Sequence, residues 1–105
     1  MSEAAKREVG ELLARIEKSP CEFNRSGTWY SGPQARSHLQ RKYIYLAERG
    51  QLGSAEDFVV LAASKSSITG EPYLIRCGAA APITSAVWLE GELRKLRAAA
   101  PPAQR

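Results

Sequence analysis

The sequence predicts an α+β fold in which about four helices pack on a small antiparallel sheet, a hairpin plus one later strand. Three observations predict it: apolar residues at helical spacing in separate segments, two short alternating segments rich in β-type residues, and serine capping boxes between them. The chain of 105 residues suffices for one hydrophobic core. We therefore expect a single domain over residues 1–100 and a disordered tail over 101–105.

The first helix is predicted from Glu3 to Lys18. Its apolar residues follow the i, i+3, i+4, i+7 spacing of one helix face, at Val9, Leu12, Leu13 and Ile16. Pro20 disfavours helical geometry in the residue before it, so the helix should end ahead of it.

A β-hairpin is predicted in CEFNRSGTWYS, residues 21–31, because apolar and polar residues alternate on both sides of a turn-prone Asn24 to Gly27 segment. Ser31 and Gln34, with Pro33 in the first turn, then form a capping box for a second helix that reaches Arg49. One face of this helix is predicted to meet the core through Ala35, Leu39, Tyr43 and Leu46.

A second box, Ser54 with Asp57, predicts a third helix that ends near Ser64. Its core-facing residues should be Phe58, Leu61 and Ala62.

A later strand is expected over residues 73–77, because Tyr73, Ile75 and Cys77 alternate onto one face. The following GAAAPIT segment, residues 78–84, is predicted to be a loop. Thr84 or Ser85 then caps a last helix with an apolar stripe at Ala86, Leu89, Leu93 and Leu96.

Composition excludes several classes of protein. The chain is 44% hydrophobic and 25% charged with a net charge of +4, close to ordinary globular proteins, so a disordered or fibrous protein is not indicated. No apolar run is long enough for a transmembrane helix. Two cysteines and one histidine cannot supply a zinc site, and we expect neither a metal nor another cofactor.

Cys21 and Cys77 lie too far apart for a C-x-x-C redox motif, so they form either one disulfide or two buried thiols. A bridge is geometrically plausible if the strands that carry them pair. The start, MSEAAKREV, has no apolar core of a signal peptide, which is consistent with a cytosolic protein or with a mature chain whose start has been replaced.

Two polar groups are candidates for a binding site. His38 and Lys42 lie one helical turn apart, so both project from the same side of the second helix and could bind an anion. The SKSSITG segment, residues 64–70, carries hydroxyls and a glycine directly after a helix, an arrangement that can bind phosphate or carboxylate. It lacks the P-loop pattern, and the simpler interpretation is a turn held by its own hydroxyls.

Charge is also distributed unevenly. Between Phe23 and Ala47 the chain has no acidic residue, and its bases there are Arg25, Arg36, Arg41 and Lys42. Interleaved aromatic residues make a single-strand nucleic-acid surface conceivable, but no recognised motif accompanies them. A solvated basic face, with Tyr43 in the core, is the simpler interpretation, so we do not expect nucleic acid as the partner.

Three segments carry a resemblance to a known family: FNRSG, ARSHLQRK and SAEDFVVLAASKSSITGEPYLIRC. Their order and spacing, over about Ile16 to Cys77, resemble the YfeK-like family of small bacterial envelope proteins. The positions that match are Phe23, Arg25, Gly27, His38, Leu39, Lys42, Ser66, Ser67, Thr69, Gly70 and Tyr73. Ser26 departs from the Asn expected before the glycine, which puts in doubt any role for an amide there.

The resemblance implies export through a cleavable signal peptide, with Met1 standing in its place, and it favours the disulfide between Cys21 and Cys77. No activity or ligand of that family is known to us. Its shared polar positions coincide with the two candidate groups above, so we expect His38, Lys42, Ser66 and Ser67 to form one surface or polar network.

Our leading hypothesis is therefore a monomeric, periplasmic binding module rather than an enzyme. It would bind an anionic small molecule or an envelope protein through Arg25, His38, Lys42, Ser66, Ser67, Thr69 and Tyr73. An alternative is a small hydrolase or transferase with His38 as the base and Ser66 or Ser67 as the nucleophile, although no carboxylate lies near in sequence to orient the base. Another alternative is a cytosolic single-strand nucleic-acid binder.

Overall fold

The computed structural model describes residues 1–99 and confirms the α+β fold class. It contains helices, a four-stranded antiparallel sheet and one disulfide. The predicted tail over 101–105 lies outside the described residues. In chain order the elements are α1 Glu3–Lys18, β1 Glu22–Arg25, β2 Thr28–Tyr30, α2 Gly32–Glu48, α3 Ala55–Asp57, η1 Phe58–Ala62, β3 Leu74–Arg76, β4 Ile83–Thr84 and α4 Ser85–Ala99.

The sheet has the strand order β2-β1-β3-β4, and every neighbouring pair is antiparallel. Phe23 of β1 lies between Tyr30 of β2 and Ile75 of β3, so these three side chains share one face. The fourth strand corrects our expectation of a loop over 78–84. Ile83 and Thr84 have no strand pattern of their own, and they are extended because they pair with Ile75 and Leu74.

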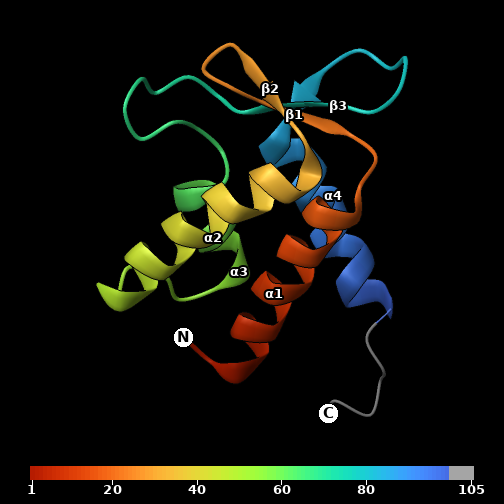
Figure 1. Cartoon of the computed structure of the whole chain (residues 1–105). Coiled ribbons are helices and arrows are strands. Elements are labelled where there is room, and N and C mark those ends of the chain that lie inside the picture. Colours follow the sequence, from red (N-terminus) through yellow and green to blue (C-terminus); the bar gives the residue numbers. More distant parts are fainter. Residues whose placement is uncertain (100–105) are drawn as a thin grey trace.

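The helices cover one face of the sheet, with α1, α2 and α4 on the same side (Figure 1). The core between the layers contains the predicted face of α1, where Val9, Leu12 and Ile16 are fully buried. Ile75 of β3 and Leu89 of α4 are buried against them. The amphipathic spacing therefore identified the core side of α1 correctly, because a helix face is determined by local geometry.

The third helix differs from the prediction. Only Ala55–Asp57 are α-helical, and the chain then forms the π-helical turn η1. The backbone N–H of Ala63 donates to the Phe58 carbonyl at 3.1 Å, an i to i+5 bond that widens the turn. Val59 is buried as a result, whereas Leu61, which we expected in the core, is 49% exposed.

The hairpin between β1 and β2 turns over only two residues. Both have positive φ, 52° at Ser26 and 88° at Gly27, as in a type I′ turn. The Asn24 side-chain oxygen accepts from the Gly27 N–H at 3.0 Å. Asn is favoured over Ser at the first position of such turns, so the departure from the YfeK-like pattern falls on a residue that controls turn geometry.

The disulfide joins Cys21 and Cys77 with their Cα atoms 4.3 Å apart. Glu22 of β1 pairs with Arg76 of β3, and one further step in this antiparallel register places the two cysteines opposite each other. The register thus explains the bridge, which closes the ends of the two central strands.

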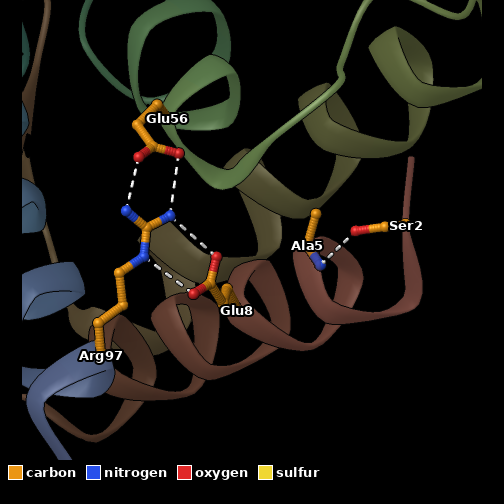
Figure 2. A network of polar contacts seen from close by, with 5 residues as sticks. All are labelled: Ser2, Ala5, Glu8, Glu56 and Arg97. Atoms are coloured by element: carbon orange, nitrogen blue, oxygen red, sulfur yellow. Dashed lines mark hydrogen bonds and ion pairs between the residues drawn. The ribbon is translucent and has the colours of Figure 1, made fainter. Parts of the chain in front are cut away.

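Far from the sheet, Arg97 connects three helices (Figure 2). Its guanidinium on α4 donates two hydrogen bonds to Glu8 of α1, at 3.0 and 3.1 Å, and two to Glu56 of α3, at 2.6 and 3.0 Å. The hydrogen bond from Arg97 lowers the pKa of Glu56 to about 2. These bidentate contacts link α4 to both α1 and α3. No helix within residues 1–99 is long and apolar enough to cross a membrane.

Candidate functional site

The sheet register places two candidate residues side by side. Asn24 pairs with Leu74, so the next residue of β1, Arg25, lies beside Tyr73, the residue directly before β3. Side chains alternate along a strand, and Arg25 and Tyr73 therefore point to the same face as Phe23 and Ile75. This is the face on which α2 packs, which brings both side chains to the helix.

Helix α2 adds His38 and Lys42 to this pair, as their spacing of one turn predicted. Arg25 Nη1 lies 2.8 Å from His38 Nδ1, and His38 Nε2 lies 3.1 Å from the Tyr73 hydroxyl. Lys42 Nζ donates to the same hydroxyl at 3.0 Å and to the Lys65 carbonyl at 3.0 Å. One residue of β1, two of α2 and the residue before β3 thus form one polar cluster, the Tyr73 cluster: Arg25, His38, Lys42 and Tyr73.

The hydrogen-bond directions in this cluster follow from its chemistry. A guanidinium can only donate, so His38 Nδ1 accepts from Arg25 and the neutral ring carries its proton on Nε2. Nε2–H then donates to Tyr73, whose oxygen also accepts from Lys42. Because its oxygen accepts twice, the Tyr73 O–H proton remains available as a donor. The cluster presents donors, which is the requirement for binding an anion.

The hydroxyl-rich loop is held by its own side chains, as the simpler interpretation predicted. The buried Ser66 Oγ accepts from the backbone N–H groups of Ile68 and Thr69, both at 3.2 Å. Thr69 Oγ1 accepts from the Glu71 N–H at 3.2 Å. Because these oxygens act as acceptors, their O–H protons remain available as donors.

The loop and the cluster line one hollow of about 420 Å³. It brings together every candidate residue that we named: Arg25, His38, Lys42, Ser66, Ser67, Thr69 and Tyr73. Ser26, Thr28, Tyr30 and Ile68 complete the lining, and no acidic residue takes part. We call this feature the polar hollow.

Two further residues were missed as site residues. Tyr30 lines the polar hollow and packs under the Arg25 guanidinium, 4.8 Å from its ring centre. Arg41 lies beside His38 at the neighbouring surface and contributes to its electrostatic environment. Arg41 was recognised in the sequence as part of the basic stretch without acidic residues, but only the fold shows that it lies near the site.

Burial and like charges determine the protonation of the cluster. Desolvation, followed by the charges of Arg25, Lys42 and Arg41, lowers the pKa of His38 from 6.5 to about 4. Desolvation and Arg25 also lower the pKa of Lys42, and burial raises that of the Tyr73 phenol. Neither Arg25 nor Lys42 forms an ion pair within residues 1–99, so the positive charge of the cluster is uncompensated there.

The lowered pKa of His38 makes stability depend on pH. Between pH 6.5 and about 4 the unfolded chain binds the proton and the folded chain does not, so the free energy of unfolding falls as the solution is acidified. We expect this contribution to be about 1 to 2 kcal/mol, because solvent screens the half-exposed ring. Urea unfolding of the wild type and of His38→Gln at pH 7 and pH 4.5 isolates the contribution of His38, because the carboxylates titrate in both proteins and their effect cancels in the comparison. An equal pH dependence in the two proteins would contradict the assignment.

The geometry offers little to the alternative functions. Both ring nitrogens of His38 are engaged by Arg25 and Tyr73, and in the described part of the chain neither Ser66 nor Ser67 hydrogen-bonds to the ring.

The basic stretch considered for nucleic-acid binding is partly neutralised, because Arg36 forms an ion pair with Glu17 of α1. Tyr43 packs edge-on against Phe58 in the core, 5.8 Å between ring centres, and cannot stack on a base there.

The residues available for a metal are equally few. Over residues 1–99, no group of three His, Cys, Asp or Glu side chains lies close enough together to hold a metal ion.

Comparison with known proteins identifies a family. No curated protein matches the chain significantly, and no solved structure does so either. One family model, described as a family of unknown function (DUF5329), matches residues 3–97. This match spans nearly all of the described fold, including both central strands and every residue of the polar hollow. The chain therefore belongs to the family of unknown function DUF5329.

Proposed function

We propose that the protein is a non-enzymatic binding module that holds an anionic ligand in the polar hollow. The observation that carries this proposal is a hydrogen-bonded cluster in a hollow without an acidic residue: His38 and Lys42 meet on the Tyr73 hydroxyl, and Arg25 donates to His38. Like charges brought together and partly desolvated destabilise the free protein. A bound anion offsets that cost and accepts hydrogen bonds from the N–H and O–H groups of the cluster that have no other acceptor.

The donors available to such an anion come from two groups of lining residues. Lys42 uses two of its three N–H protons in hydrogen bonds, and the Tyr73 O–H can donate. The hydroxyls of Ser66, Ser67 and Thr69 line the same hollow. A carboxylate or a phosphate has the several acceptor oxygens needed to contact both groups.

The compartment in this proposal is the bacterial periplasm, where the protein acts as a monomer. The resemblance to the YfeK-like envelope proteins supports export through a signal peptide. The disulfide between Cys21 and Cys77 supports it as well, because disulfides persist in oxidising compartments and are rare in the cytosol.

The test compares anion binding with stability in the same variants. Lys42→Met removes the charge and retains most of the apolar stem, and Ser67→Ala removes one hydroxyl. We expect Lys42→Met to weaken the binding of inorganic phosphate about tenfold or more, because hydrogen bonds to charged groups contribute about 1.5 to 3 kcal/mol. Ser67→Ala should weaken it by a smaller factor. Amide chemical shifts in an NMR titration measure both affinities.

The melting temperature of Lys42→Met should stay unchanged or rise, because the variant relieves repulsion from Arg25. Lys6→Ala provides the matched control, since this exposed lysine near the start of α1 carries the same charge far from the hollow. Loss of binding together with unfolding of Lys42→Met and Ser67→Ala would show that the network is structural. Equal weakening by Lys6→Ala would show that only net charge matters.

A further inference from the structure

A second pocket, which is mostly apolar, adjoins the polar hollow. It has a volume of about 300 Å³ and lies where α2 crosses the sheet. Its inner wall includes buried core side chains from four elements: Phe23 of β1, Ala35 and Leu39 of α2, Ile16 of α1 and Leu89 of α4. We call it the apolar pocket.

The outer part of the pocket is polar and positively charged. Gln34, Ser37 and Arg41 are exposed lining residues and therefore mark its mouth. Four residues line both the pocket and the polar hollow, namely Arg25, Tyr30, His38 and Tyr73. The two features are thus adjacent and share these residues, which places an anion site and an apolar site side by side.

The size of the pocket limits what enters it. Protein cores are close-packed and contain few voids larger than a water molecule, so an apolar pocket that reaches core residues is a candidate ligand site. A cavity of about 150 Å³ accommodates benzene. The apolar pocket is about twice that size, which leaves room for roughly ten carbon atoms.

We propose that the ligand is an anionic amphiphile, a medium-length acyl chain or similar apolar group with one carboxylate or phosphate head. The head contacts Lys42, Arg25 and the loop hydroxyls, and the apolar part lies between Phe23 and Leu39. This inference rests on the proposed anion site and adds the part of the ligand that the anion site does not specify.

The first experiment is a chain-length series measured by isothermal titration calorimetry with acetate, butanoate, hexanoate, octanoate, decanoate and dodecanoate. Each pair of methylene groups buried should tighten Kd about tenfold. The gain should stop near decanoate, when the pocket is full. Octanol should bind at least about tenfold more weakly than octanoate, because it lacks the charge.

The second experiment separates the two parts of the site by substitution. Ala35→Leu adds volume to the pocket wall and should weaken octanoate about tenfold or more while leaving phosphate unchanged. Lys42→Met should weaken octanoate and phosphate by the same factor. Ala47→Leu is the matched control, because it makes the same change at an exposed position of the same helix. It should bind octanoate as the wild type does.

Each outcome decides between the claims. Equal affinity for acetate and octanoate would overturn the amphiphile and leave the anion site standing. Equal affinity for octanol and octanoate would also overturn it, since the head would contribute nothing. Binding of neither phosphate nor any carboxylate would overturn the anion site and the amphiphile together. Sedimentation with vesicles of an anionic phospholipid, without binding of free octanoate, would replace the small amphiphile by a membrane surface.

Discussion

Removal of the disulfide between Cys21 and Cys77 is expected to lower the free energy of unfolding by about 4 kcal/mol. The bridge closes a loop of 56 residues, and in the chain-entropy model this loop accounts for a loss of that size. Domains of this length are stabilised by only about 5 to 15 kcal/mol in total. Urea unfolding of the oxidised protein, of the same protein kept reduced, and of Cys21→Ala/Cys77→Ala measures the loss.

The reduced wild type provides the sharpest control, because its sequence is unchanged. A difference below about 1 kcal/mol in the free energy of unfolding between oxidised and reduced protein would contradict the prediction.

The same bridge also tests the compartment. A thiol-alkylating reagent, applied under denaturing, non-reducing conditions to protein isolated from its native host, should modify neither cysteine. Two alkylated cysteines would contradict export to the periplasm.

The substitution Gly32→Ala is expected to destabilise the protein by about 2 to 3 kcal/mol, although alanine is the better helix former. Gly32 is the first residue of α2 and is buried against the end of α1. A Cβ atom there would lie 2.8 Å from the Glu17 carbonyl oxygen and still closer to that of Ile16. These are backbone atoms, and the Ile16 carbonyl already accepts from Ser19 at the end of α1. The two helices would therefore have to separate.

Gly10→Ala is the matched control for this prediction. Gly10 lies inside α1 on its exposed side. Apart from the chain neighbours and backbone of its own helix, no atom of the described residues lies within 4 Å of the Cβ that would be added. This substitution should raise the free energy of unfolding by about 0.5 to 1 kcal/mol, from helix propensity alone. Opposite signs in thermal or urea unfolding would confirm that close packing of α1 against α2 dominates at Gly32. If both variants are stabilised, Gly32 does not lie this close to the carbonyl groups of Ile16 and Glu17 in solution.

Both predictions bear on the candidate site, because the elements they join also position it. The disulfide lies in the same β1–β3 register that places Arg25 beside Tyr73, and Gly32 sets the start of the helix that carries His38 and Lys42. Loss of either contact should loosen the polar hollow as well as the fold.

Much of the local structure followed from the sequence by itself. The capping box of α2 is present as expected, with Gln34 N–H donating to Ser31 Oγ at 3.3 Å and Ser31 N–H donating to Gln34 Oε1 at 3.0 Å. Its partners are three residues apart, so no other part of the chain is needed to form it. For the same reason the core face of α1 could be identified from spacing, as could the projection of His38 and Lys42 from one side of α2.

Features that depend on distant partners were decided by the tertiary structure. The strand β4 exists because Ile83 and Thr84 pair with β3, and the π-helical turn buries Val59 in place of Leu61. Arg36 is neutralised by Glu17, a residue of another helix. None of these leaves a pattern in its own segment, since each is stabilised by contacts formed only when the elements pack.

The candidate site was likewise predicted in part from the sequence and decided in part by the tertiary structure. Residue types and helical spacing nominated its members, and the resemblance to a known family favoured bringing them together. Only the fold placed the Arg25 guanidinium beside His38 Nδ1 and the polar hollow beside an apolar pocket. Hydrogen bonds between residues 13 and 35 positions apart in the sequence require the register of the sheet and the position of α2, and no local sequence pattern determines either.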